Sequence, residues 1–248
     1  MAVKVRRAVV TGGGRGIGRG IAAALSGAGH KVSVLGRAEG PLKETVSSGA
    51  AADYHIIDVT DEAALIGCLN EIGAIDILVN NAGVADSASF LKSDIAFFRR
   101  IMAVDFESVV IASRTVLPGM IERKFGRIIS IASVAGLKGI PYATAYTAAK
   151  HAVVGLTRAL AVEVAKSGVT VNAVCPAYVD TDLVTENAAR IAARTGRTAE
   201  EITKTFYKDN PQQRLITVEE VADAVLWIAG DRAGSVNGQA IAITGGEI

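Results

Sequence analysis

The first apolar segment of the chain runs directly into a glycine-rich stretch, Thr11-Gly12-Gly13-Gly14-Arg15-Gly16-Ile17-Gly18. The residues before it, Ala8–Thr11, have the composition of a short buried strand, and Gly18–Ala28 has the 3.6-residue apolar period of a helix. Glycines let a backbone approach a ligand closely, and a helix N-terminus presents unpaired N–H groups to an anion. The spacing is T-G-x-x-x-G-x-G rather than G-x-G-x-x-G. Its place between a strand and a helix nevertheless predicts a site for the pyrophosphate of a dinucleotide.

The rest of the chain continues this alternation of β-branched runs and longer helical stretches. Further strands are predicted at Val32–Leu35, His55–Ile57, Ile75–Val79, Arg127–Ile131, Val169–Val174 and Ala240–Ile243. Further helices are predicted at Glu62–Ile72, Asp94–Arg123, Tyr146–Ser167 and Val218–Ala229. The pattern predicts an α/β fold: a single-domain, Rossmann-type, doubly wound, seven-stranded parallel sheet with helices on both faces.

Residues 181–210 interrupt this pattern, because they are longer and more polar than the other connections. They follow the strand Val169–Val174, and ligands of doubly wound sheets bind beyond the carboxyl ends of the strands. We therefore expect a substrate lid at about 181–210, with an ordinary surface excursion as the alternative. No repeat, low-complexity segment or linker divides the chain, so residues 1–248 are expected to form one dinucleotide-binding and catalytic domain.

Composition argues against several classes of protein. Half of the residues are apolar, 21% are charged and the formal net charge is +1, which leaves no basic field for nucleic acid or an anionic membrane. No uncharged apolar run approaches the roughly 20 residues of a spanning helix, and no secretory signal is visible. Cys68 and Cys175 lack metal-ligand spacing and are expected to be buried thiols. We expect a cytoplasmic protein with no metal site, no membrane association and no nucleic-acid partner.

The second predicted strand bears on the choice of dinucleotide. An NAD site usually places an acidic residue near the end of this strand to bind the ribose 2′-hydroxyl, but none occurs from Val32 to Ala38. Arg37 stands there instead, and Arg15 lies in the glycine turn; guanidinium groups suit a 2′-phosphate. We therefore favour NADP(H). Glu39, just beyond the strand, keeps NAD(H) as the alternative. Arg37 would otherwise stack on adenine with either cofactor, and Arg15 would be solvated.

A second group of residues has the pattern of a catalytic site. Tyr146 and Lys150 are one helical turn apart on the same face of a predicted helix. Ser133 follows the strand Arg127–Ile131, and Asn80-Asn81-Ala82-Gly83 follows the strand before it. A Y-x-x-x-K pair alone is common on structural helices. Its combination with the upstream serine, the Asn-Asn-Ala-Gly segment and the glycine turn is much more specific.

With these motifs in this order, the chain resembles the short-chain dehydrogenases/reductases from end to end. The resemblance implies that Tyr146 is the general acid/base, that Lys150 activates it and anchors a ribose, and that Ser133 binds the substrate oxygen. It also implies a homotetramer, which two long helices rich in small apolar residues support. Cofactor contacts are implied for Asp58 and Val59 at the adenine, Asn81 and Gly83 beside the cofactor, and Val179 and Thr181 at the nicotinamide carboxamide.

Physical chemistry supports these roles independently. A phenol has a pKa of about 10 and is therefore a poor base at pH 7. Lowering this pKa by about three units, to 7, requires roughly 4 kcal/mol of stabilisation of the phenolate. A neighbouring ammonium and an oxidised nicotinamide would contribute this in a partly desolvated cleft. A serine hydroxyl would stabilise charge on the substrate oxygen while the phenol transfers the proton.

The chain departs from the family pattern at two places. The family usually has Asn where this chain has Asp105, and that Asn holds a relay water; a carboxylate accepts hydrogen bonds but cannot donate them as an amide does. We include Asp105 among the candidate catalytic residues for this reason. The family also favours Pro-Gly where this chain has Pro176-Ala177. Alanine in place of glycine reduces the conformational freedom of this loop.

Within the family, the chain resembles the branch of 3-oxoacyl reductases and 3-hydroxyacyl-CoA dehydrogenases, most clearly in Asn172–Asp182 and Asn210–Thr217. The implied substrate is a 3-oxoacyl or 3-hydroxyacyl thioester. Three arginines of the lid would meet CoA phosphates or lie on a solvated helix face: Arg190, Arg194 and Arg197. Two alternatives remain: a dehydrogenase of a free cyclic or aromatic secondary alcohol, and a catalytically silent cofactor-binding partner subunit.

Overall fold

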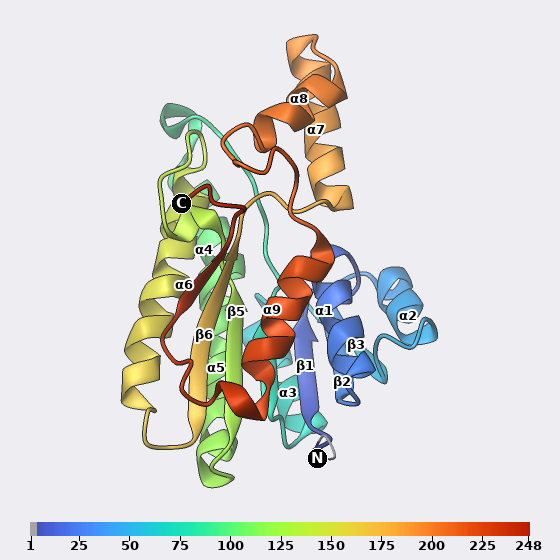
Figure 1. Ribbon diagram of the computed structural model, residues 1–248, viewed down its shortest axis with the longest axis vertical. Helices are drawn as coiled ribbons and strands as arrows, with labels where there is room; N and C mark the ends of the chain where they lie inside the picture. The colour runs from blue at the N-terminus through green and yellow to red at the C-terminus, as the bar shows by residue number, and fades with distance from the viewer. Residues whose placement is uncertain (1–3) are drawn as a thin grey trace.

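The computed structural model describes residues 4–248, except for the side chain of Arg194. Parallel strands form one sheet in the order β3-β2-β1-β4-β5-β6-β7 (Figure 1). The strands are β1 (Arg7–Thr11), β2 (Lys31–Gly36), β3 (Asp53–Ile56), β4 (Ile77–Asn80), β5 (Gly126–Ile131), β6 (Val169–Pro176) and β7 (Ala240–Ile243). The strand order reverses between β1 and β4, so the predicted doubly wound seven-stranded parallel sheet is confirmed.

Helices cover both faces of the sheet because alternate strand residues point to opposite sides. Ala8 and Val10 of β1 pack in a cluster with residues of α1 (Gly16–Gly27), α2 (Glu39–Ser47) and α9 (Val218–Ala229). Val9 packs in a second cluster with residues of α3 (Glu62–Ile72), α5 (Ser108–Glu122) and the end of α6 (Thr144–Glu163). With both faces covered, the carboxyl edge of the sheet is left as the place for a ligand.

The predicted helix Asp94–Arg123 is interrupted. It consists of α4 (Ile95–Met102), a π-helical turn η2 (Ala103–Glu107) and α5. The apolar period runs through all three parts, so the sequence pattern did not reveal the wider turn. Where the π turn joins α5, the Ser108 hydroxyl donates to the Val104 carbonyl at 2.6 Å. Single π turns often mark functional sites, and this one contains Asp105.

Three helices were not predicted: α2, α7 (Asp182–Thr195) and α8 (Ala199–Phe206). Each of these helices buries few apolar side chains, so its sequence lacks the apolar stripe from which a helix is predicted. Figure 1 shows α7 and α8 projecting beyond the carboxyl end of the sheet. Short 3-10 turns complete the order: η1 (Phe90–Lys92), η3 (Val134–Gly136) and η4 (Asp231–Ala233). Within residues 4–248, every helix falls short of the length and apolarity needed to cross a membrane.

Candidate active site

The glycine turn places the start of α1 at the carboxyl end of β1. Gly12 and Gly16 have φ of +66° and +51°, the left-handed conformation that favours glycine. The N–H groups of Gly12 and Gly13 donate to the Leu35 carbonyl of β2, at 2.7 and 3.2 Å. A Cβ at Gly18 would lie 2.3 Å from the Gly12 carbonyl oxygen, so the helix packs directly on the turn.

The N-terminus of α1 is open to an anion. Its N-cap residue, Arg15, makes no side-chain capping bond, and the first turn holds no acidic residue. The first-turn N–H groups of a helix have no partner within the helix, and the helix dipole adds partial positive charge there. This end therefore fits the pyrophosphate of a dinucleotide.

Hydrogen bonds of Thr11 and Asn81 hold the glycine turn in place. The Thr11 hydroxyl accepts the N–H groups of Asn81 and Ala82, both at 3.0 Å. The Asn81 amide donates to the carbonyls of Thr11 and Gly12, at 2.9 and 3.2 Å. These bonds join the carboxyl ends of β1 and β4.

A cavity of about 620 Å³ extends from the glycine turn across the carboxyl ends of the strands, a size typical of ligand sites. Thr11 is buried beneath the turn and does not line the cavity. The other predicted site residues all line it: Gly12, Arg15, Gly16, Ile17, Gly18, Arg37, Asp58, Val59, Asn81, Gly83, Asp105, Ser133, Tyr146, Lys150, Val179 and Thr181. The structure thus brings together residues that span most of the chain.

At the β2 end of the cavity, Arg37 lies 3.9 Å from the Asp58 carboxylate and is largely exposed. Hydrogen bonds from Thr60, and then the charge of Arg37, lower the pKa of Asp58. Glu39 is engaged elsewhere. Its carboxylate pairs with Lys43 at 3.0 Å and accepts the Tyr54 hydroxyl at 3.1 Å, and these two contacts lower its pKa.

Ser133, Tyr146 and Lys150 line the same cavity. Ser133 caps η3, and its hydroxyl accepts the Ala135 N–H at 3.1 Å. Lys150 is buried; its Nζ donates to the Ile131 carbonyl at 3.1 Å and lies 5.5 Å from the centroid of the Tyr146 ring. Both side chains project from α6 one turn apart, as the spacing predicted.

Asp105 lies behind this group and is completely buried. Its Oδ1 is 3.0 Å from Lys150 Nζ, and its Oδ2 accepts the Val84 N–H at 3.2 Å. Burial raises the pKa of Asp105, although the Lys150 ammonium and the Val84 N–H act in the opposite direction. Burial alone would lower the pKa of Lys150, but the Asp105 carboxylate raises it above the usual value, so the ammonium is retained. Within residues 4–248, Oδ1 has no hydrogen-bond donor at a suitable angle.

The opposite wall of the cavity contains residues that sequence reasoning missed. Tyr178 lies two residues after the end of β6 and stacks on Phe206 of α8 with 4.7 Å between ring centroids. Burial is the main cause that raises the pKa of Tyr178. Proximity to the strand end was a usable signal for Tyr178. Phe206 is distant in sequence and had none.

The arginines of the predicted lid are placed differently. Arg190 lines the cavity and donates to the Asn187 side chain at 3.0 Å. Arg197 lies outside the cavity lining and pairs with Glu201 at 3.8 Å. The side chain of Arg194 lies outside the described part of the structure.

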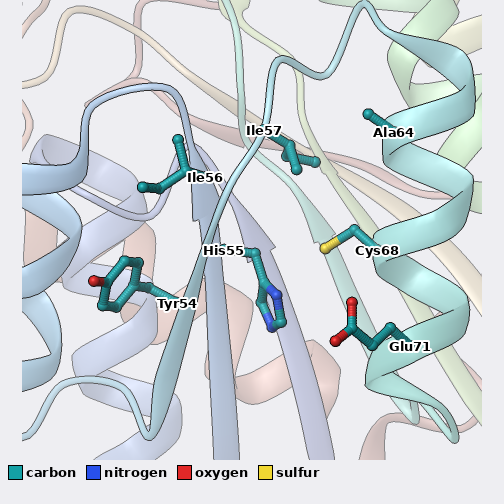
Figure 2. A pocket seen from close by; sticks show the side chains of 7 residues that line it. All are labelled: Tyr54, His55, Ile56, Ile57, Ala64, Cys68 and Glu71. Carbon is teal, nitrogen blue, oxygen red and sulfur yellow. The ribbon is translucent and has the colours of Figure 1, made fainter.

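A second hollow, of about 490 Å³, lies between the edge strand β3 and α3 (Figure 2). Cys68 and Glu71 of α3 face His55 of β3 across it. Burial raises the pKa of the Cys68 thiol to about 11, so the thiol is protonated at neutral pH and is a weak nucleophile. Within residues 4–248, no group of three or more His, Cys, Asp or Glu side chains is arranged to hold a metal ion.

An open helix N-terminus at the switch point of a doubly wound sheet, beside a Ser–Tyr–Lys group, defines a dinucleotide-dependent oxidoreductase. The family model described as short chain dehydrogenase matches residues 6–192, and the chain belongs to that family. It is 37% identical to the D-beta-hydroxybutyrate dehydrogenase of Rhizobium meliloti (strain 1021), over 97% of this chain and 98% of the relative. It is 34% identical to the acetoacetyl-CoA reductase of the same strain, over 98% of both chains.

Among solved structures, a variant of actinorhodin polyketide ketoreductase with NADPH superposes with a TM-score of 0.93. It is 32% identical to this chain and covers 98% of this chain and 97% of its own. The prediction of the family and of an enzyme is confirmed: the protein is an NAD(P)-dependent oxidoreductase acting on CH–OH groups.

Proposed function

We propose that the protein interconverts 3-oxoacyl and 3-hydroxyacyl compounds, with a thioester as substrate and NADP(H) as the preferred cofactor. The observation that carries the proposal is the convergence of Ser133, Tyr146 and Lys150 in one cavity with the open N-terminus of α1. The names of the relatives support the substrate class, because hydroxybutyrate, acetoacetyl-CoA and a polyketide share an oxygen on the carbon β to a carboxyl or thioester group.

The residues of the cavity fit the cofactor. The α1 N-terminus would hold the pyrophosphate, and Asp58 and Val59 would lie at the adenine. Arg37 would bind a 2′-phosphate, because it follows β2 directly and no acidic residue lies between Val32 and Ala38. Glu39 is turned toward Lys43 and Tyr54, which weakens the alternative of NAD(H). The solved ketoreductase with NADPH supports the same choice.

When bound, the nicotinamide would supply hydride to a carbonyl or accept it from an alcohol. The Ser133 hydroxyl donates a hydrogen bond to the substrate oxygen, and Tyr146 donates its proton to that oxygen in reduction or removes it in oxidation. Lys150 stabilises the phenolate form of Tyr146. With the 5.5 Å to the ring centroid as the separation and an effective dielectric constant of about 20, this amounts to about 3 kcal/mol before the opposing field of the Asp105 carboxylate is counted.

The proposal is tested with acetoacetyl-CoA and NADPH. Tyr146→Phe should lower kcat by at least about 1000-fold while leaving NADPH affinity within a factor of three, because only the proton-carrying hydroxyl is lost. Tyr54→Phe is the matched control, since Tyr54 lies on β3 outside the cavity lining and should retain activity. Substantial turnover by Tyr146→Phe would overturn the mechanism. Absence of activity in the wild type would overturn the substrate class.

A free cyclic or aromatic secondary alcohol is the second candidate substrate. The stacked pair Tyr178 and Phe206 favours it, because an aromatic wall in the cavity suits a planar or cyclic ring. Comparing kcat/KM for cyclohexanol, 1-phenylethanol and 3-hydroxybutyryl-CoA separates the two candidates. A catalytically silent subunit would oxidise none of them.

We further infer that residues 181–210 form the substrate lid and that the protein assembles as a cytoplasmic homotetramer. The lid is supported by α7, one face of which lines the cavity. Assembly is supported by large apolar side chains left exposed on helices, such as Val162 on α6 and Trp227 on α9, which are 80% and 57% exposed. Sedimentation velocity at micromolar concentration should give a tetramer, and a stable monomer would contradict the inference.

A further inference from the structure

Four basic side chains line the large cavity, and three of them are paired with carboxylates. Arg15 lies 3.8 Å from Glu186, Arg37 lies 3.9 Å from Asp58, and Lys150 lies 3.0 Å from Asp105. The fourth, Arg190, has no carboxylate within 4.0 Å in the described part of the chain. It is the one cavity-lining cation of residues 4–248 whose charge is not already matched.

Arg190 lies on the cavity face of α7. Leu183, Val184, Asn187 and Ile191 line the cavity from the same helix, at the spacing of a single helical face. The Asn187 amide oxygen accepts one guanidinium N–H at 3.0 Å, which orients the fork and leaves the other donors available.

Arg190 lies far from the end of the cavity beside the glycine turn, where the pyrophosphate would bind. α7 begins beside the glycine turn, where a Cβ at Gly16 would lie 3.3 Å from Thr181. At 1.5 Å per residue, Arg190 is about 13 Å farther along the helix axis. Phe206 of α8, which stacks on Tyr178, also lines the cavity. Arg190 thus belongs to the substrate side.

We propose that Arg190, oriented by Asn187, binds an anionic group of the substrate and so determines substrate preference. This inference rests on the proposed function. The shared chemistry is an oxyanion held by a guanidinium fork: the carboxylate of a free 3-oxo acid or a phosphate of a CoA thioester. The apolar residues on either side of Arg190 on the same face contact the carbon skeleton.

The test compares three substrates that carry the same 3-oxobutanoyl group: 3-oxobutanoate, acetoacetyl-CoA and the uncharged acetoacetyl-N-acetylcysteamine thioester. Arg190→Gln should raise KM about 10-fold for whichever charged substrate uses this contact and change the uncharged thioester by less than a factor of two, because only a charge-assisted contact is lost. Arg190→Lys should recover part of the loss. Arg197→Gln is the matched control, a lid arginine outside the cavity lining.

The pattern of losses identifies the anion. A loss confined to 3-oxobutanoate assigns a carboxylate, and a loss confined to acetoacetyl-CoA assigns a carrier phosphate. Equal losses on all three substrates, no loss on any, or the same loss in Arg197→Gln would overturn the assignment while leaving the proposed function intact. If the wild type reduced none of the three, the proposed function would fail and the assignment of Arg190 with it.

Discussion

Asp105→Asn should move the rise of alcohol oxidation to lower pH. The substitution removes a buried negative charge beside the Lys150 ammonium and keeps the shape of the side chain. In the wild type, this carboxylate holds the lysine protonated, but its own field opposes the phenolate form of Tyr146. The two effects act on different parts of the pH profile, so they can be separated.

The magnitude follows from two distances in the structure. Lys150 Nζ is 5.5 Å from the Tyr146 ring centroid and 3.0 Å from Asp105 Oδ1, which places Oδ1 at most about 8.5 Å from the ring. At an effective dielectric constant of about 20, the carboxylate then opposes the phenolate by at least about 2 kcal/mol. Since 1.36 kcal/mol corresponds to one pH unit, the oxidation profile should shift downward by at least about 1.4 pH units.

The alkaline side should change as well. Asp105 raises the pKa of Lys150 against the effect of burial, so its removal lowers that pKa. Above the lowered value the ammonium is lost, and the rate in Asp105→Asn should fall again at high pH. Asp105→Ala should be less active than either form, because the Val84 N–H also loses its acceptor.

The assay is kcat for oxidation of 3-hydroxybutyryl-CoA from pH 6 to 10.5 at saturating NADP⁺. Asp86→Asn is the matched control. Asp86 also lines the cavity, but it pairs with Arg100 at 2.9 Å rather than with Lys150, and its removal should shift the profile by less than about 0.5 unit. Superimposable profiles for the wild type and Asp105→Asn would refute the electrostatic reasoning.

Three further predictions address the cofactor and the fold. Arg37→Asp should raise KM for NADPH at least about 10-fold and leave NADH unchanged or improved; equal losses for both would contradict a 2′-phosphate contact. Gly18→Ala should abolish cofactor binding measured by fluorescence titration, because its Cβ would lie 2.3 Å from a backbone oxygen, whereas Gly27→Ala on the same helix meets nothing within 4 Å and should be tolerated. Glu220→Gln should lower the free energy of unfolding by about 1 kcal/mol and Tm by about 2–4 °C at pH 7. Hydrogen bonds from Arg214 lower the pKa of Glu220 to about 2, so this contribution is complete above about pH 4.5 and is lost as the pH falls toward 2. Calorimetric scans at pH 7 and pH 3 should therefore show a smaller difference at pH 3, and an equal difference would contradict the pairing.

The strands and the covering helices could be predicted because their signals are local. Val9 and its neighbours in β1 form a β-branched run that is buried on both faces, as a central parallel strand requires. The π turn could not be predicted, because one extra residue in a turn leaves the apolar period of Asp94–Arg123 nearly unchanged. The helices α7 and α8 could not be predicted either, since burial in them is limited to a few side chains such as Ala188 and Ile202.

The site residues likewise divide into those with a local sequence signal and those without one. Gly12, Arg37, Asn81 and Ser133 each stand just beyond a predicted strand, and parallel strands bring their carboxyl ends to one edge. Topology alone therefore predicts that they converge. Phe206 enters the cavity only because α8 folds back against Tyr178, a contact between residues far apart in sequence. The contact between Asp105 and Lys150 likewise depends on how the π turn packs against α6.

The two parts of the cavity carry different properties of the enzyme. Ser133 and Lys150 are buried and held by backbone hydrogen bonds, so the reaction type is built into the sheet and α6. Arg190 is exposed and held by a single bond to Asn187 on a helix with few buried residues. Changes in α7 should therefore be tolerated by the fold, and under the proposed role of Arg190 they affect substrate binding without affecting proton transfer. It follows that substitution of Arg190 should change which substrate is preferred and leave the pH profile in place, whereas substitution of Asp105 should move the pH profile for every substrate alike.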